Sequence, residues 1–591
     1  MSGFGSRVLE PRVLALTADA ERSQPQVQTW DAFGHRVDKL ITSEGWRKLS
    51  AIGIAEGIVA IPYEAEYGPY SRVYQFLKYH LWSGSSAIVT CPSAMTDGAA
   101  KLLARQLARG ESSKPLSDAE KQVFQDAYRR LVSRDPEFAW TSGQWMTERP
   151  GGSDVRNTET LAKQSTTSAS ETAEDTNGQP LGPWSIDGFK WFSSATDSQM
   201  SVLLAKMPDG KSISAFYVPT RRRAPQAPEG SELNGIQIQR MKQKLGTRGL
   251  PTAELVLSDM RAYLIGAPGT GVKEISTILN ITRIHNTISA VGFWGRGLSI
   301  SRAFSRVRST SGKLLIDTPA HVRTLAEQHV GYRAMMHLAF FAAALLGVSE
   351  SSSGFGSGGK AAAFAHLPDT FNSYHLLLRL ITPVAKASTA RATIAGLAEC
   401  MESLGGVGYL ENDNMELNIA RLYRDANVLS IWEGTTNVMA DDVVRVVKSR
   451  DGDSVVHALT EWITATTAQL QDEAAVQSLR SATTSLVEYI RLSSSEALKL
   501  NGRVLVSRLG WLICGTLLAA DAARDGDAVT KEVLRRWLER KEKPLYGYGS
   551  MEDDSGLSRE TRGKDASGEG VLWDRKIVFG DNPEETGRAK L

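Results

Sequence analysis

The chain has 591 residues, which is too long for a single hydrophobic core and predicts several domains. Hydrophobic residues make up 42% and charged residues 23% of the sequence, as in an ordinary globular protein. The formal net charge is only +2, so no overall field would attract nucleic acid or an anionic membrane.

Neither the cysteines nor the apolar runs indicate a special environment. Cys91, Cys400 and Cys514 lie far apart without metal-ligand or disulfide spacing, so we expect a reducing or neutral compartment and no metal site. The longest apolar run, residues 337–348, is too short to cross a bilayer, and the first residues lack the pattern of a secretory signal. We therefore expect a soluble protein without a membrane span.

Apolar periodicity divides the chain into helical and β-prone stretches. Residues 30–134 have apolar residues three and four apart, which predicts helices. Residues 139–265 contain short β-prone runs split by Gly and Pro, which predict a small β domain. Inside it, residues 165–180 have almost no apolar side chain and predict an exposed loop. Long helical periods return over residues 272–447 and predict a bundle of four or five helices.

The bundle is followed by a further helical stretch over residues 455–540 and then by a mostly irregular tail. Gly292, Gly295 and Gly297 predict close contact between bundle helices. The expected fold class is mainly α with a central β domain. The predicted domains are an N-terminal helical domain (1–138), a β domain (139–266), a C-terminal helical bundle (267–450), a helical extension (451–543) and a tail (544–591).

Two glycine-rich segments superficially suggest nucleotide binding. Residues 353–361 have the spacing of a phosphate loop, but Ala361 stands where a hydroxyl must hold magnesium, and a helical run precedes it instead of a strand. We predict a flexible connection between helices there. The cluster Gly405-Gly406-Val407-Gly408 lacks the strand and the glycine spacing of a Rossmann domain.

One carboxylate is set in an apolar run before a small, polar turn, in Ser430-Ile431-Trp432-Glu433-Gly434-Thr435-Thr436-Asn437. Taken alone, Glu433 is typical of a partly exposed helix end as well as of a general base. The segment Met146-Thr147-Glu148-Arg149-Pro150-Gly151-Gly152-Ser153-Asp154 places the hydroxyls of Thr147 and Ser153 around a glycine pair. Such donors suit an acceptor-rich ring or a phosphate, although the same residues also form ordinary polar turns.

Two more segments complete the set, namely Gly188-Phe189-Lys190-Trp191-Phe192-Ser193-Ser194, and Leu404-Gly405-Gly406-Val407-Gly408-Tyr409 followed by Arg424-Asp425. In this order the segments resemble the acyl-CoA dehydrogenase family over residues 24–447. Residues 30–38, residues 190–193 and the helical extension resemble its AidB-like branch most. The resemblance implies an N-terminal helical domain, a β-barrel-like middle domain and a C-terminal bundle, with FAD as cofactor and an acyl-CoA or related thioester as substrate.

By this resemblance, Thr147 and Ser153 would bond the flavin ring and pyrophosphate, and Phe192 and Ser194 would cover the ring in place of a Trp and a Thr. Phe192 can stack but cannot donate a hydrogen bond. The sequence departs from the family pattern at Trp145, where a small residue is usual. The implied cofactor-binding residues are Met146, Thr147, Gly152, Ser153, Phe192, Ser194, Arg308, Gly405, Gly406, Thr435 and Asn437.

Arg308 matches an arginine that reaches the FAD of a neighbouring subunit in the family, which implies a homo-oligomer, either a dimer or a tetramer. Ser311 stands where that motif usually has Phe, and a solvated helix charge is the plain alternative for Arg308. Glu433 matches the family's general base, and burial would raise the pKa of such a carboxylate. Arg283 matches an arginine near that base, with a structural ion pair as its alternative.

The predicted reaction is the introduction of an α,β double bond into an acyl thioester, in fatty-acid or secondary metabolism. The alternatives are an acyl-CoA oxidase that uses dioxygen and a flavin-containing protein that protects DNA from alkylation. Nucleic-acid binding has little support, because the one basic run, residues 535–543, is broken by Glu539 and Glu542. The final tripeptide Ala589-Lys590-Leu591 follows the peroxisomal address pattern and predicts recognition by the import receptor of a peroxisome.

Overall fold

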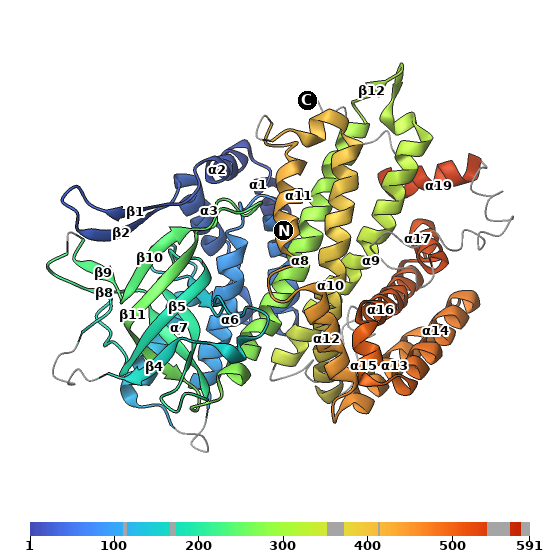
Figure 1. Cartoon of the computed structure of the whole chain (residues 1–591). Helices are drawn as coiled ribbons and strands as arrows, with labels where there is room; N and C mark the ends of the chain where they lie inside the picture. The colour runs from blue at the N-terminus through green and yellow to red at the C-terminus, as the bar shows by residue number, and fades with distance from the viewer. Residues whose placement is uncertain are drawn as a thin grey trace. The chain divides into compact units, whose positions relative to one another are not determined.

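The computed structural model describes residues 1–109, 115–165, 173–227, 229–351, 371–411, 414–540 and 568–580. The chain divides into two compact units. The first unit comprises Met1–Glu66 and Leu77–His285, and the second comprises Tyr67–Phe76 and Asn286–Leu591. The helix α8 (Gly271–Ser305) contributes residues to both (Figure 1).

The first unit is helical at its start but contains a hairpin that the sequence did not predict. Strands β1 (Gln26–Trp30) and β2 (Arg36–Ile41) pair antiparallel, where helix was expected from residue 30 onward. The Asp31 carboxylate accepts hydrogen bonds from the backbone N–H groups of Phe33 and His35, at 2.8 and 2.9 Å. Such a side-chain turn competes with helix formation and closes the hairpin. The helices of this part are α1 (Ser2–Arg7), α2 (Pro11–Arg22), α3 (Glu44–Ala55), α4 (Ile61–Glu64), α6 (Thr90–Leu107) and α7 (Asp118–Leu131), while α5 (Ser71–Ser83) begins in the second unit.

The middle of the first unit is a seven-stranded sheet (Figure 1). Its strands are β3 (Ser142–Trp145), β4 (Leu161–Gln164), β5 (Trp184–Ser194), β6 (Met200–Lys206), β7 (Ile213–Pro219), β10 (Ile236–Met241) and β11 (Thr252–Ile265). The order is β10-β11-β5-β4-β6-β3, and β7 pairs with both β11 and β6. A small hairpin of β8 (Arg221–Arg223) and β9 (Ser231–Leu233) lies outside this sheet. Strand β6 is buried on both faces because α6 and α7 pack on one side, with Leu103, Phe124 and Val202 in one cluster, and apolar strand residues fill the other.

The predicted exposed loop at residues 165–180 is, in its described part, a turn with half-buried and exposed residues around one buried carboxylate. The Asp175 side chain is buried, and its carboxylate accepts from the backbone N–H groups of Asn177 and Gln179 at 2.7 and 3.0 Å. Burial raises the pKa of this carboxyl. The polar composition therefore reflects a tight turn folded around one carboxylate.

The second unit is a bundle that continues α8 with α9 (Pro319–Glu350), α10 (Phe371–Ser403), α11 (Ile419–Val428) and α12 (Thr436–Val447) (Figure 1). Glycines let its helices approach closely, as predicted. A Cβ added to Gly295 would lie 2.5 Å from the Tyr332 hydroxyl, and one added to Gly297 would lie 2.6 Å from a Leu397 methyl. The predicted connection at residues 353–361 lies outside the described residues.

The helical extension consists of α13 (Gly452–Thr467), α14 (Glu473–Leu492), α15 (Ser495–Leu500), α16 (Gly502–Asp525) and α17 (Ala528–Glu539). The irregular tail predicted after residue 541 contains a helix, α19 (Gly568–Phe579), which corrects the prediction. Its residues Ile577 and Val578 are buried, and Arg575 pairs with Asp317 at 3.1 Å. An apolar surface shared with the bundle thus orders a segment whose surroundings are rich in Gly, Asp and Glu.

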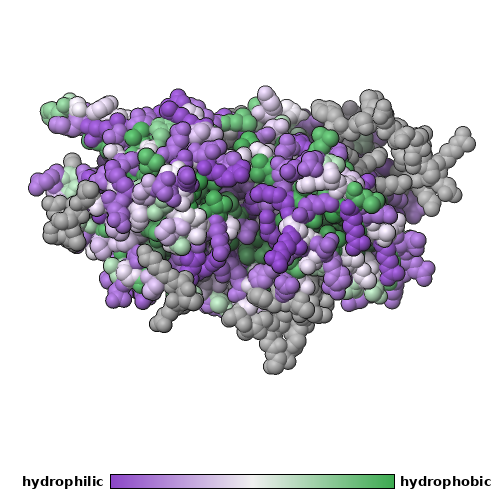
Figure 2. All heavy atoms as spheres, turned by 60° about the horizontal axis from the view of Figure 1, so that its bottom comes forward, coloured by the Kyte–Doolittle hydropathy of each residue, from purple (hydrophilic) through white to green (hydrophobic). Residues whose placement is uncertain are grey.

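Two helices, α9 and α16, are long and apolar enough by composition to cross a membrane, although the sequence predicted no such segment. Their most apolar windows are 67% and 72% buried inside the protein, which is the environment of core helices. Hydrophilic residues cover most of the face drawn in Figure 2, with hydrophobic residues between them.

Candidate active site

A buried ion pair joins two of the predicted motif segments in the first unit. The Lys190 ammonium on β5 lies 2.6 Å from Oε1 of Glu148 and donates to the Leu204 carbonyl at 2.9 Å. The Thr160 hydroxyl donates to the same carboxylate oxygen at 2.6 Å. The side chains of Lys190 and Glu148 are 0% and 3% exposed. The pair therefore fixes the loop after β3 to the centre of the sheet.

The electrostatic environment keeps this carboxylate charged. Burial by itself raises the pKa of Glu148, but the Lys190 charge and the hydrogen bonds from Lys190, Thr160 and Glu159 outweigh it, so the pKa is lowered. Burial lowers the pKa of Lys190, and the Glu148 charge opposes that shift. Two opposite charges with satisfied hydrogen bonds are the form in which ions occur in a protein interior.

The loop anchored by Glu148 presents the predicted hydroxyls. Met146 is buried in the core, Thr147 is half-buried, and the Thr147 carbonyl accepts from the backbone N–H of Trp191 at 2.9 Å. A Cβ added to Gly152 would lie 3.1 Å from the Thr147 methyl, so Gly152 closely approaches Thr147. Ser153 is exposed.

Strand β5 ends with Phe192 and Ser194. The Phe192 side chain is 49% exposed, and the Ser194 hydroxyl shares a 3.0 Å hydrogen bond with that of Thr252 on β11. The Trp145 indole donates to the Ser194 carbonyl at 3.1 Å. The departure from the family pattern at Trp145 thus has a structural role, because this indole ties β3 to the end of β5.

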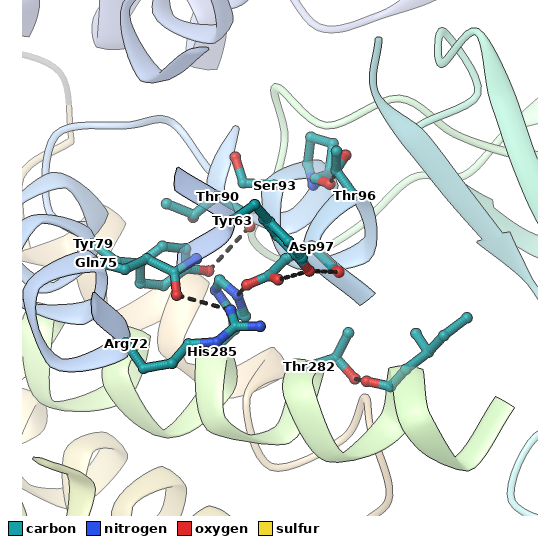
Figure 3. Close-up of polar contacts among 12 residues, drawn as sticks. Tyr63, Arg72, Gln75, Tyr79, Thr90, Ser93, Thr96, Asp97, Thr282 and His285 are labelled. Atoms are coloured by element: carbon teal, nitrogen blue, oxygen red, sulfur yellow. Dashed lines mark hydrogen bonds and ion pairs between the residues drawn. The ribbon is translucent and has the colours of Figure 1, made fainter. Parts of the chain in front are cut away.

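A second buried polar network in the first unit was missed by the sequence reasoning (Figure 3). His285 on α8 meets Asp97 on α6, with 2.7 Å between His285 Nε2 and Asp97 Oδ2, and both side chains are 0% exposed. The Tyr63 hydroxyl is 2.7 Å from Asp97 Oδ1, and the Tyr79 ring packs edge-on against the imidazole at 4.5 Å. Arg283, two residues earlier on α8, is half-buried. The sequence signal that could have indicated this network is a histidine and an aspartate that each stand inside an apolar helical pattern.

In the second unit, Glu433 lies in the turn between α11 and α12. Its φ is +57°, and Gly434 follows with φ +103°. Glu433 is half-buried, and the Thr435 hydroxyl caps α12 by accepting from the Val438 N–H at 3.5 Å. Lys386 donates to the Gly434 carbonyl, and the Trp432 indole donates to Oδ1 of Asn286. Sequence reasoning missed Lys386 and Asn286, because each stands among several other polar residues of its helix.

Other predicted residues of the second unit have mixed surroundings. The Asn437 amide oxygen accepts from Arg503 Nε at 2.7 Å, so it already has a partner in the helical extension. Gly405 has φ +63°, and among the described residues, chain neighbours aside, no atom lies within 4 Å of a Cβ added to Gly405 or to Gly406. The close approach in this cluster is at Gly408, where a Cβ would lie 2.0 Å from the Met401 carbonyl oxygen.

Arg308 stands at the base of a projecting hairpin formed by β12 (Ser309–Thr310) and β13 (Lys313–Leu314). Ser311 and Gly312 have φ of +50° and +79°, which makes a tight turn and explains why a small residue stands at 311. The Arg308 side chain is exposed and has no ion-pair partner among the described residues.

Three family models match the chain, namely adaptive response protein AidB N-terminal domain over residues 1–121, acyl-CoA dehydrogenase middle domain over 143–260, and acyl-CoA dehydrogenase C-terminal domain over 269–448. The acyl-CoA dehydrogenase family member 11 of Caenorhabditis elegans is 39% identical over 460 residues, which are 76% of this chain and 67% of that protein. The chain belongs to the acyl-CoA dehydrogenase family. Enzymes of this family use FAD, and this protein is accordingly an FAD-dependent acyl-CoA dehydrogenase.

Two further comparisons support the fold and the AidB-like branch. The crystal structure of Caenorhabditis elegans ACDH-11 in complex with C11-CoA has a TM-score of 0.79 and 34% identity to the dehydrogenase, covering 98% of this chain and 90% of that one. Putative acyl-CoA dehydrogenase AidB of Escherichia coli (strain K12) is 28% identical over 453 residues, covering 76% of this chain and 74% of that protein. The fold class and the family predicted from sequence are therefore confirmed.

The first unit of the dehydrogenase fits a flavin. An isoalloxazine has a flat apolar face and an edge rich in hydrogen-bond acceptors. The end of β5 offers an exposed aromatic ring at Phe192, and the half-buried hydroxyls of Thr147 and Ser194 are donors that satisfy such an edge. A Cβ at position 152 would lie 3.1 Å from the Thr147 methyl, so the glycine at this position leaves that side of Thr147 uncovered. The chemistry of this donor set matches the cofactor of the family.

Replacing Lys190 by Met would leave the Glu148 carboxylate buried without its counter-charge. We expect the free energy of unfolding to fall by about 3–5 kcal/mol, because removing one partner of a buried ion pair strands the other charge. Chemical denaturation at neutral pH measures this loss. The lowered pKa of Glu148 means that the contribution of the pair is present above the ordinary carboxyl pKa and is lost as the pH falls through the lowered value.

Lys163→Met is the matched control. Lys163 lies on the neighbouring strand β4 and pairs with Asp187 at 2.9 Å on the surface, so its replacement should cost only about 0–1 kcal/mol. Equal losses in the two variants would contradict an anchoring role for Lys190.

Proposed function

We propose that the dehydrogenase introduces an α,β double bond into an acyl-CoA, with Glu433 as the general base. The observation that carries this proposal is a half-buried carboxylate held in a left-handed turn, inside the region that matches the C-terminal domain of the family. A non-glycine residue with positive φ is unusual, and such backbone strain concentrates where a side chain has a functional direction.

The roles of the chain's residues follow from their chemistry. Glu433 removes the proton α to the thioester carbonyl. A bound FAD would supply the acceptor for the hydride that leaves the β carbon. Thr147, Ser153 and Ser194 would hold the cofactor by hydrogen bonds, and the exposed ring of Phe192 would cover it.

The substrate class is supported by the relative of known structure. A protein 34% identical to this chain has been crystallised with C11-CoA. An acyl-CoA therefore fits the proposal, and the length of the acyl chain is left open. Arg283 is proposed to act near the base, as its counterpart in the family does; in this structure it is half-buried on α8.

Glu433→Gln should abolish catalysis, because the amide cannot accept the α-proton. Anaerobic mixing of the FAD-loaded enzyme with a panel of acyl-CoAs should bleach the flavin absorbance in the wild type and not in the variant. Glu416→Gln removes an exposed carboxylate of the same unit and should bleach as the wild type does. Bleaching at the wild-type rate in Glu433→Gln would refute the assignment of the base.

We also propose that Arg308 contacts the pyrophosphate of FAD bound to a second copy of the chain. Its exposure on a projecting hairpin supports this role. Thr435, Asn437, Gly405 and Gly406 are assigned to the same cofactor only by resemblance. Peroxisomal import, dioxygen as electron acceptor and a role in secondary metabolism are proposals that rest on the sequence, and Ala589-Lys590-Leu591 lies outside the described residues.

Arg308→Ala should weaken FAD binding by about 10- to 100-fold, because a hydrogen bond to a charged group is worth about 1.5–3 kcal/mol. Fluorescence titration of the apoprotein with FAD measures this effect. The control is Lys313→Ala, which removes an exposed cation from the other strand of the same hairpin and should leave the affinity unchanged. Equal FAD affinities for the two variants would remove Arg308 from the site.

Protection of DNA gains no support from the described residues. The basic run at residues 535–540 is already engaged by carboxylates and carbonyls. Arg535 pairs with Glu532 at 2.7 Å, Arg536 pairs with Glu532 and Asp574 at 2.7 and 2.5 Å, and Arg540 donates to the Glu327 carbonyl at 2.8 Å. We therefore do not propose a nucleic-acid partner.

A further inference from the structure

The turn that carries Glu433 has a conformation that local sequence does not favour. For an amino acid with a side chain, the left-handed region places Cβ close to the carbonyl oxygen, so Glu433 at φ +57° is strained. Such a conformation persists only when surrounding contacts determine it. The anchors of this turn therefore decide the direction in which the carboxylate points.

One anchor is the Asn286 side chain on α8, which is 4% exposed. Its Oδ1 accepts from the Trp432 indole, and its Nδ2 donates to the Leu429 carbonyl at 3.2 Å. The Asn286 amide thus holds the turn at two points, at Leu429 where the turn begins and at Trp432 immediately before Glu433. An aliphatic side chain of the same size could make neither contact.

The other anchor is Lys386 on α10, which is 0% exposed and donates to the Gly434 carbonyl. This contact fixes the peptide unit between Gly434 and Thr435, one residue beyond Glu433. Gly434 is also confined from the side of α12, since a Cβ there would lie 2.5 Å from the Met439 methyl. Glu433 therefore lies between two anchored neighbours, Trp432 and Gly434.

We infer that Asn286 and Lys386 are positioning residues for the α-proton transfer, acting through the backbone of the Glu433 turn. The inference rests on the proposed role of Glu433 as the base. Proton transfer requires a carboxylate oxygen within hydrogen-bond reach of the carbon-bound proton. If either anchor is lost, the turn can relax toward negative φ and carry the carboxylate away, while the binding of substrate and FAD persists. Both residues lie within the matched C-terminal domain, and neither was predicted from sequence.

A double-mutant cycle on Trp432 and Asn286 tests this inference. Trp432→Phe keeps an aromatic ring and removes the indole donor together with one of the two fused rings, and Asn286→Leu keeps the volume and removes the amide. For each variant the anaerobic bleaching rate at saturating acyl-CoA should fall about 10- to 100-fold, which is the scale expected for a misplacement of about 1 Å. Because both changes break the same link, the double variant should be no slower than the slower single variant. FAD content and the KM for acyl-CoA should change less than about twofold, because only the positioning of the base is altered.

Hydrogen exchange of the segment 429–434 supplies a measurement that does not depend on activity. Its amides should exchange faster in Asn286→Leu and in Lys386→Met, while those in the middle of α12 stay protected. Lys386→Gln retains an N–H donor and should keep more activity than Lys386→Met. Asn427→Leu is the matched control for Asn286→Leu, because within the part of the chain that the structure describes the Asn427 amide donates to the Tyr423 carbonyl of its own helix, at 2.6 Å, and makes no hydrogen bond with the Glu433 turn.

Rate losses that multiply in the double variant, or an unchanged rate in Trp432→Phe and Lys386→Met, would overturn the inference. Glu433→Gln is run beside these variants as the reference. If it bleaches the flavin normally, the proposed function fails. If it is inactive while the anchor variants react at the wild-type rate, only the positioning role fails.

Discussion

The buried pair of Glu148 and Lys190 determines the shape of the proposed cofactor site in the first unit. A charge in a protein interior needs a partner and full hydrogen bonding. The loop after β3 must therefore pack on β5 at the point where Glu148 contacts Lys190. With that contact made, the Thr147 carbonyl receives the Trp191 N–H, and the Phe192 ring emerges at the end of the strand. The hydroxyls and the ring of the site thus lie beside two buried residues that fix the segments carrying them.

The sequence indicated the residues that we propose for the chemistry of the site, but not the residues that hold them in place. Thr147, Phe192 and Glu433 could be proposed from sequence because their neighbours form local patterns that resemble those of the family. Lys190 and Asn286 have hydrogen-bond partners that lie 42 and 146 residues away in the sequence. A charged or amide side chain is expected to face solvent unless its partner is known, and the sequence alone does not identify a partner so distant. What was missing was knowledge of tertiary contacts and not of residue type.

The same reason explains the errors in the fold. Helix was predicted from residue 30 because helical periodicity dominates the residues that follow, whereas the Asp31 side chain ends that tendency through hydrogen bonds to its own turn. The helix α19 was missed because it lies in a segment rich in Gly, Asp and Glu, and because its residues Ile577 and Val578 are buried only once the chain has folded onto the bundle. The left-handed backbone at Glu433 was equally hidden, although the glycine that follows it did predict a turn.

The helical extension begins where the match to the family's C-terminal domain ends, at residue 448, yet the core of the second unit does not end there. Trp462 stacks on Phe341 of the bundle with ring centroids 4.7 Å apart, and the Cys514 thiol meets the Ala334 carbonyl at 3.3 Å. Arg503 also reaches Asn437 on α12. The residues that match the family's C-terminal domain therefore share one hydrophobic core with the helices that follow them, and removing those helices would expose apolar side chains such as Phe341 to water.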